Sequence, residues 1–178
     1  SGPVSVLVNC AGVARTAPFE KTGDAIWDEL WRINVLGAVH TTRAVLPAMR
    51  ALPRGRIINV ASTAALKGYA YAAAYAASKH ALLGLTRSLA LELTGTAVTA
   101  NAICPGYTDT AIVRDGVDTI VARTGRTRAE AQAVFTGSNP QRRLIAPDEV
   151  AATVLWLIGD GARSVTGQAL AVAGGEVM

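Results

Sequence analysis

Short, mainly apolar runs rich in β-branched residues alternate along this chain with longer segments whose apolar residues recur at helical intervals. The apolar runs lie at 4–8, 56–61, 98–104 and 169–173. Each has the length and the nearly continuous apolar character of a strand that is buried on both faces of a sheet. The pattern therefore predicts four buried β-strands.

Helical periodicity occupies the intervals between these runs. Apolar residues at helical spacing predict helices over 24–50, 72–93 and 148–158. We expect Pro47 to distort the first helix near its end and Gly95 to end the second. Because strand and helix alternate, the sequence predicts an α/β fold in which a parallel sheet carries helices on both faces.

The carboxyl ends of the first three predicted strands are followed by segments that are suited to ligand binding. These segments are 9–12, Ser62 and 105–110. In open parallel sheets, ligands bind beyond the carboxyl ends of the strands, and these ends lie at one edge. We therefore expect a single site that draws on all three segments.

The composition narrows the class of protein. The chain has 178 residues, of which 51% are hydrophobic, and this predicts one globular domain with a good core. No apolar run reaches the roughly 18 residues of a membrane span, so neither a span nor a signal peptide is predicted and a cytoplasmic location is expected. Cys10 and Cys104 lie in apolar segments without metal-ligand spacing, so we expect two buried thiols and no metal site.

The charge distribution gives no sign of a polyanionic partner. The net charge is +4 and only 5% of the residues are aromatic, with no stacking motif, so nucleic-acid binding is not expected. The densest group of arginines is interpreted as a solvated face, with attraction of an anionic substrate such as a phosphate-bearing thioester as the alternative. This group comprises Arg123, Arg126, Arg128, Arg142 and Arg143.

Candidate chemistry is concentrated in a tyrosine and a lysine on the second predicted helix. Tyr75 and Lys79 are four residues apart, which makes them neighbours on a helix surface. The ammonium is expected to favour the phenolate and to lower the pKa of Tyr75 toward the neutral range. Ser62 is expected to donate a hydrogen bond to a reacting oxygen. The alternative is a chance surface pair, but the convergence of three segments at one edge favours catalysis.

Five local patterns, taken in order, resemble one family. They are Asn9-Cys10-Ala11-Gly12, Asn34, Ser62, Tyr75 with Lys79, and Pro105-Gly106-Tyr107-Thr108-Asp109-Thr110. On these patterns the whole chain resembles the classical short-chain dehydrogenase/reductase family. The end of the chain, from Val165 to Gly175, is also similar to the last strand of that family. The resemblance implies a Rossmann-like, doubly wound parallel sheet.

The resemblance also implies an activity, which is the NAD- or NADP-dependent interconversion of a secondary alcohol and a ketone. In this family Tyr75 would exchange a proton with the substrate oxygen and Ser62 would orient that oxygen. Lys79 would lower the pKa of the tyrosine and hold the nicotinamide ribose. Asn34 would help to link Lys79 to solvent through water. A role in bridging a helix irregularity is the alternative for Asn34.

The resemblance carries further site residues onto this chain. Cys10 replaces the second asparagine of the family pattern, which weakens hydrogen bonding at that strand end. The residues expected to bind the cofactor are Asn9, Ala11, Gly12, Tyr75, Lys79, Pro105, Gly106, Thr108 and Thr110. Ser62, Tyr75 and Tyr107 are expected to contact substrate. Tyr69 and Tyr71 have no lysine four residues later and are interpreted as pocket wall or packing.

The resemblance further implies that residues 1–178 form a partial domain. The chain begins where the fourth strand of the family would lie, without the glycine-rich turn that receives the pyrophosphate or the residue that selects NAD or NADP. We therefore expect a fragment of a longer enzyme that binds dinucleotide poorly and is weakly active or inactive. The run at 4–8 is expected to form an open apolar edge.

Substrate and assembly are predicted from the same likeness. Residues 111–143 stand where the substrate lid lies, with a short helix expected at Thr127-Arg128-Ala129-Glu130. This region resembles members that act on 3-hydroxyacyl or 3-oxoacyl thioesters of coenzyme A or acyl carrier protein, or on 3-hydroxybutyrate; a cyclic alcohol or a sugar is the alternative. The helices at 24–50 and 72–93 resemble dimer faces, so a homodimer or homotetramer is expected. A non-catalytic oligomerisation module is the competing hypothesis.

Overall fold

The computed structural model describes residues 2–178 and contains a four-stranded, wholly parallel sheet in the order β1-β2-β3-β4. In the registers, Val8 lies opposite Ile58, and Cys104 lies opposite Ala171. The strands are β1 (Val6–Asn9), β2 (Gly55–Val60), β3 (Val98–Pro105) and β4 (Ala169–Val172). All four predicted strands are confirmed, as is their parallel arrangement.

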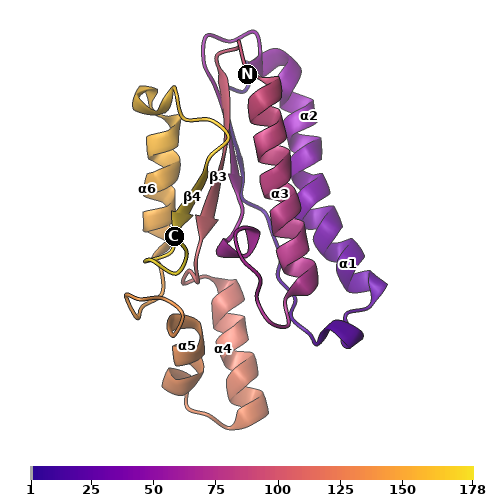
Figure 1. The fold of residues 1–178 in the computed structure, drawn as a ribbon, viewed down its shortest axis with the longest axis vertical. Coiled ribbons are helices and arrows are strands. Elements are labelled where there is room, and N and C mark those ends of the chain that lie inside the picture. The colour runs from indigo at the N-terminus through magenta and orange to yellow at the C-terminus, as the bar shows by residue number, and fades with distance from the viewer. Residues whose placement is uncertain (1) are drawn as a thin grey trace.

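Helices cover both faces of the sheet (Figure 1). Because successive strand residues point to opposite faces, Ile57 packs with Met49 and Leu89 on one face, while Ile58 packs with Leu157 on the other. The helices of the first face are α1 (Asp24–Trp31), α2 (Gly37–Met49) and α3 (Ala73–Glu92); α6 (Pro147–Ile158) covers the second. This layering confirms the predicted α/β class.

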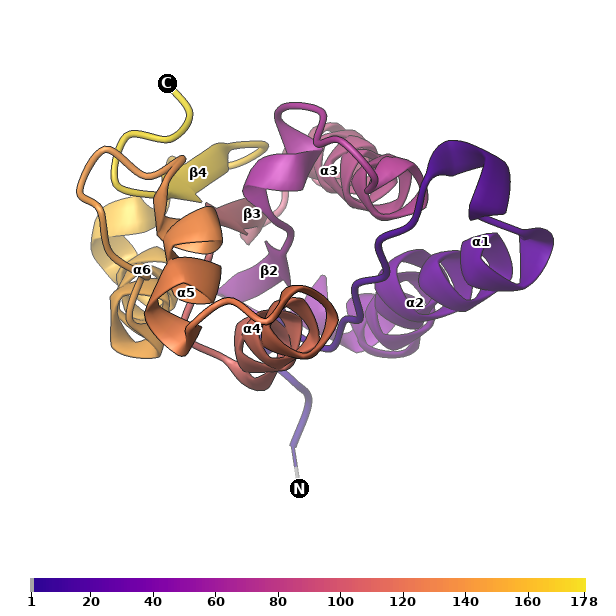
Figure 2. The same cartoon turned by 90° about the horizontal axis from the view of Figure 1, so that it is seen from below.

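Two further helices lie beyond the carboxyl ends of the strands. They are α4 (Ala111–Thr124) and α5 (Arg128–Thr136), and Figure 2, seen from that end, shows them in front of the sheet. The short helix predicted near Thr127 is confirmed as α5, with Thr127 and Glu130 forming a capping box. Helix α4 was not predicted, although Val113 and Val117 bury one of its faces.

The helix predicted over 24–50 is confirmed over 24–49, but it is not a regular α-helix throughout. A π-helical turn, Arg32–Leu36, separates α1 from α2, and it contains the buried Asn34. The side chain of Asn34 bonds to Val13 and Ser78, which are distant in sequence, so contacts outside the helix hold this irregularity. Single π-helical turns inside α-helices are frequently found at functional sites. Further along, α2 passes Pro47 and ends at Met49.

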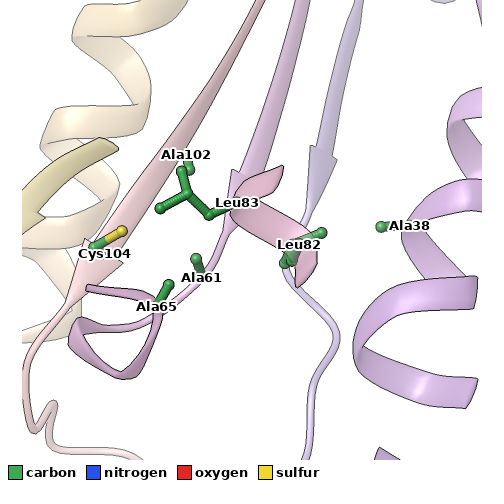
Figure 3. Packing of buried hydrophobic residues seen from close by; sticks show 7 residues of the cluster. All are labelled: Ala38, Ala61, Ala65, Leu82, Leu83, Ala102 and Cys104. Atoms are coloured by element: carbon green, nitrogen blue, oxygen red, sulfur yellow. The ribbon is translucent and has the colours of Figure 1, made fainter. Parts of the chain in front are cut away.

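Small side chains bring α3 close to the sheet beneath the site. Figure 3 shows Leu82 and Leu83 of α3 among alanines of the neighbouring elements and Cys104 of β3. The two leucines are 2% and 4% exposed, so the helix that carries Tyr75 is fixed on the strands that lead to the site. A closely packed base of this kind limits movement of the groups above it.

Leu82→Ala is expected to destabilise the protein by ~2–5 kcal/mol, because it removes buried methyl groups and leaves a cavity. The measurement is the free energy of unfolding in urea. Val134→Ala is the control: Val134 lies on α5, outside the proposed assembly face, and is 52% exposed, so its replacement should change the free energy by no more than about 0.5 kcal/mol. Equal losses from the two variants would contradict the packing described.

The cysteine expectation is half wrong. Cys104 is buried as predicted, whereas Cys10 is exposed, and both thiols are free. Cys10 follows β1, which pairs only with β2 among the described residues and so stands at the edge of the sheet. Val4 and Val8 at this edge are 42% and 37% exposed.

Within residues 2–178, no helix combines the length and apolar character that crossing a membrane requires.

Candidate active site

Ser62 stands at the carboxyl end of β2, where it begins a short 3-10 turn, Thr63–Ala65. Its Oγ accepts a hydrogen bond from the Ala64 backbone N–H at 3.1 Å. Because that bond occupies a lone pair of the oxygen, the hydroxyl hydrogen remains available for donation. Ser62 is near enough to Tyr75 to lower the pKa of its phenol.

Tyr75 and Lys79 lie one turn apart on α3 and face the same edge of the sheet. The Lys79 Nζ atom is 5.8 Å from the centre of the Tyr75 ring, and it donates a hydrogen bond to the Val60 carbonyl oxygen at 3.1 Å. Lys79 is 5% exposed, and no salt bridge to it occurs among residues 2–178. Burial therefore lowers the pKa of Lys79 to about 8.

The pKa of Tyr75 shifts in the direction opposite to the one expected from its lysine neighbour. Burial raises the pKa of Tyr75, and the Ser62 hydrogen bond offsets only part of this effect. Burial disfavours the charged phenolate, while Lys79 is itself partly neutral near pH 8 and so exerts a weaker field. In the protein without cofactor, Tyr75 is therefore a neutral phenol, which is the form that donates a proton.

Asn34 connects the π-helical turn to both sides of the site. Its Oδ1 accepts from the Val13 N–H at 2.9 Å, and its Nδ2 donates to the Val13 carbonyl and to the Ser78 hydroxyl, each at 3.0 Å. The Ser78 hydroxyl in turn donates to the Tyr75 carbonyl oxygen at 2.7 Å. Asn34 thus fixes the segment after β1 against the turn of α3 that presents Tyr75.

A cavity of about 500 Å³ opens between these groups and α6. It is lined by Val8, Cys10, Gly12, Val13, Val60, Ala61, Tyr75, Lys79, Pro105, Thr108, Thr110, Ile112, Pro147, Val150, Ala151, Val154 and Leu155. The α6 residues of this wall were not predicted as site residues, although their helical spacing marked one apolar face. The cavity joins the three strand ends that the sequence predicted would meet.

Gly12 leaves room that any side chain would fill. A Cβ atom there would lie 3.3 Å from both Asn34 Oδ1 and Lys79 Nζ. A side chain at this position would therefore crowd the Asn34 amide oxygen and the Lys79 ammonium, so glycine keeps the backbone close to both groups where they border the cavity, with apolar α6 residues opposite. These features fit the nicotinamide and ribose end of a dinucleotide.

The other predicted cofactor residues divide into two groups. Pro105, Thr108 and Thr110 line the cavity as expected. The Asn9 side chain instead bonds to Thr41, Thr42 and Asn59. Ala11 is exposed, and Gly106 packs against Ala173 and Glu176. Tyr107, predicted to contact substrate, lies edge-on to Tyr69 and to Phe135 of α5.

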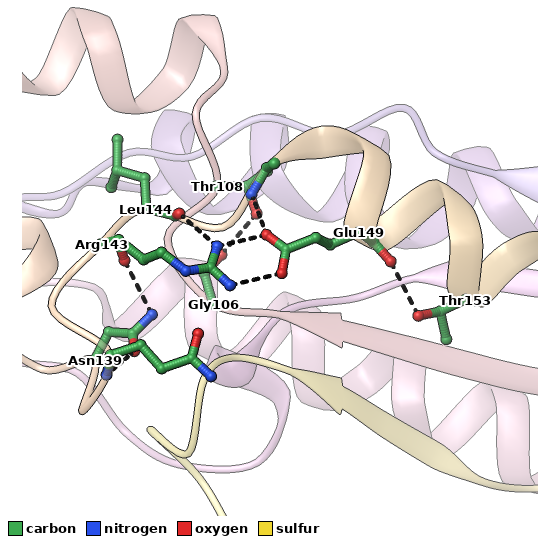
Figure 4. A network of polar contacts seen from close by, with 9 residues as sticks. Gly106, Thr108, Asn139, Arg143, Leu144, Glu149 and Thr153 are labelled. Carbon is green, nitrogen blue, oxygen red and sulfur yellow. Dashed lines mark hydrogen bonds and ion pairs between the residues drawn. The ribbon is translucent and has the colours of Figure 1, made fainter.

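A polar network holds the segment after α5 against α6 and the strand-end loop (Figure 4). The Arg143 guanidinium donates two hydrogen bonds to the Glu149 carboxylate, at 2.6 and 2.7 Å. This pairing lowers the pKa of Glu149 to about 2. Arg143 also donates to the Leu144 carbonyl, and Ile145 forms a parallel bridge with Thr108. The charge of Arg143 is therefore paired within the chain.

Comparisons with known proteins agree with this geometry. Residues 1–176 match the family model described as Enoyl-(Acyl carrier protein) reductase. The chain is 42% identical to a putative ketoacyl reductase of Streptomyces coelicolor, and the match covers 98% of this chain and 67% of that protein. It is 39% identical to a D-beta-hydroxybutyrate dehydrogenase of Cupriavidus necator, covering 99% of this chain and 69% of the relative.

Solved structures give the same result. The chain superposes on a variant of the actinorhodin polyketide ketoreductase with NADPH, with a TM-score of 0.91, 39% identity, and coverage of 98% of this chain and 67% of that one. An aldohexose dehydrogenase from Thermoplasma acidophilum, in ligand-free form, matches with the same TM-score at 31% identity, covering 98% and 68% of the two chains. The chain belongs to the short-chain dehydrogenase/reductase family of NAD(P)-dependent oxidoreductases, as the sequence motifs predicted.

Proposed function

We propose that the protein interconverts the keto and hydroxyl groups of a 3-oxoacyl or 3-hydroxyacyl thioester, or of a 3-hydroxy acid. The observation that carries this proposal is the buried Lys79 one helical turn from Tyr75, with its Nζ 5.8 Å from the centre of the phenol ring, both lining a cavity of about 500 Å³. Support for the substrate class comes from relatives named as ketoacyl reductase and acetoacetyl-CoA reductase.

The neutral phenol of Tyr75 would supply the proton in ketone reduction. Bound NAD(P)H supplies the hydride, so the chain itself must orient the carbonyl and protonate its oxygen. The Ser62 hydroxyl, which is held next to the phenol, would donate a second hydrogen bond to that oxygen. Positioned acid catalysis of this kind is worth on the order of 10²–10⁴-fold in rate.

Lys79 and Asn34 would support proton transfer by Tyr75 without contacting the substrate oxygen themselves. The Lys79 ammonium would donate to the hydroxyls of the nicotinamide ribose and, once the site is filled, favour the phenolate that remains after proton transfer. The Asn34 amide oxygen and the Lys79 Nζ both lie close to Gly12, each 3.3 Å from where a Cβ atom of that residue would be. A water molecule bound by Asn34 would link the ammonium to solvent and return the proton to the site.

A sugar is the second candidate substrate, because the aldohexose dehydrogenase of Thermoplasma acidophilum has the same fold at 31% identity. The two candidates are separated by assay. Oxidation of NADPH or NADH is followed with acetoacetyl-CoA, and reduction of NADP⁺ or NAD⁺ with aldohexoses. Turnover of acetoacetyl-CoA alone supports our proposal, while turnover of the sugar alone replaces it. Cofactor binding by calorimetry without turnover of either would favour a non-catalytic module.

We also propose that the protein forms a homodimer or a homotetramer through α2 and α3. The outer face of α3 carries the small residues Gly84 and Ser88, which permit close approach, and Leu91, which is 78% exposed. Light scattering during size-exclusion chromatography should give two or four times the mass of the chain. A monomeric mass would contradict this assembly.

A further inference from the structure

A chain of hydrogen bonds beside the candidate active site reaches the last residues of the protein. The Tyr69 hydroxyl lies 2.5 Å from Glu176 Oε1 and 2.6 Å from Thr63 Oγ1. The Lys67 Nζ is 3.2 Å from the same carboxylate oxygen. Glu176 is 107 residues away from Tyr69 in the sequence, so the fold brings the two side chains together. The Glu176 side chain is only 1% exposed. A carboxylate buried to this degree needs partners, and Tyr69 and Lys67 provide them.

The direction of these bonds follows from the chemistry of the groups. An ionised carboxylate only accepts, so Tyr69 must donate its proton to Glu176. The Tyr69 oxygen is then free to accept from Thr63, the residue next to Ser62. Burial raises the pKa of Tyr69 most, and the hydrogen bond and the charge of Glu176 raise it further, in agreement with this order. Tyr69 is therefore a fixed neutral donor to Glu176 and has no proton to offer a substrate.

Glu176 also contacts the loop that follows β3. Its Oε2 is buried without a hydrogen-bond partner among the described residues, and it lies against Gly106, where a Cβ atom would come within 2.9 Å. The Tyr69 ring meets the Tyr107 ring edge-on, at 6.2 Å between centres. One carboxylate thus connects the end of the chain, the loop after β3 and the turn after Ser62.

We propose that Glu176 is a positioning residue that acts through Tyr69 and Thr63 to hold the turn carrying Ser62. The proposal rests on the proposed function, because it assigns this chain of bonds to the residue that orients the substrate oxygen. Thr63 is 3% exposed and follows Ser62 directly, so movement of Thr63 moves the Ser62 hydroxyl. Small misplacements of an orienting group slow the chemical step more than they weaken binding.

The kinetic test compares four variants of the full chain with acetoacetyl-CoA and NADPH. Tyr69→Phe and Glu176→Ala each break the chain of bonds and should lower kcat about tenfold. The double variant should lower kcat no more than either single variant does, because both substitutions break the same chain of hydrogen bonds. Glu176→Gln keeps an oxygen that accepts from Tyr69 and should remain within about threefold of the original kcat. The Kd for NADPH should stay unchanged in all four.

The control and a second readout separate this proposal from the proposed function. Tyr71→Phe makes the same chemical change in the same loop at a residue that is 67% exposed, and it should leave kcat unaltered. Hydrogen exchange of the Ala64 and Ala65 amides should quicken in Tyr69→Phe and Glu176→Ala but not in Tyr71→Phe. The proposal would be overturned by additive losses of kcat in the double variant or by a loss of kcat in Glu176→Gln as large as in Glu176→Ala. Unchanged amide exchange in Tyr69→Phe and Glu176→Ala would overturn it as well. Since exchange needs no turnover, it decides the matter even if the protein does not reduce acetoacetyl-CoA.

Discussion

Tyr75→Phe is expected to lower kcat for ketone reduction by on the order of 10²–10⁴-fold while leaving NADPH affinity within about threefold, because only the proton donor is removed. The ring, its place on α3 and the neighbouring Lys79 remain. Burial raises the pKa of Tyr75, so the neutral phenol is the form present over the usual assay range. The loss should therefore be nearly independent of pH below neutrality.

Two measurements separate the effect of Tyr75→Phe on the chemical step from its effect on cofactor binding. Single-turnover rates report the chemical step, and quenching of protein fluorescence by NADPH reports cofactor binding. Tyr71→Phe, at an exposed position four residues earlier, is the matched control and should behave like the unmodified protein. A Tyr75→Phe variant with near-normal kcat would remove Tyr75 from its catalytic role and would transfer the proton donation to another group, such as Ser62.

The sequence predicted the strands because each one is a nearly continuous apolar run between turn residues. Tyr75 and Lys79 were placed together by helical spacing alone, which is a local property. The π-helical turn at Asn34 could not be predicted in the same way. It depends on bonds to Val13 and Ser78, which are 21 and 44 residues away. For helix α4, Val113 and Val117 were a usable signal, but Gly116 and the surrounding charges obscured it.

Burial explains the wrong expectation for the pKa of Tyr75. Spacing shows that a cation is near the phenol, but it does not show how much water either group has lost. Burial acts on both groups and favours their neutral forms, so it overrides the simple effect of one charge on its neighbour. The hydrogen bond between Tyr69 and Glu176 could not be predicted from the sequence either, since only the folded chain brings these residues together.

Lys79→Met is expected to abolish turnover and weaken cofactor binding, yet to make the protein more stable. The pKa of Lys79 is lowered from 10.5 to about 8 by burial, which means that the folded state binds this proton less well than the unfolded chain. At pH 7 both states are protonated, and the buried ammonium destabilises the fold by about 3 kcal/mol. Methionine removes this cost and fills a similar volume.

The pH dependence gives the prediction its sign. As pH rises from about 8 to about 10.5, Lys79 loses its proton in the folded state while the unfolded chain keeps it, so the stability contributed by this group increases. Urea unfolding of the original protein should show this increase, and Lys79→Met should lack it. Val134→Met on the exposed side of α5 is the control. If Lys79→Met had a lower free energy of unfolding than the original protein at pH 7, the buried ammonium would have to stabilise the fold. Its burial would then have a structural role rather than a role in cofactor binding.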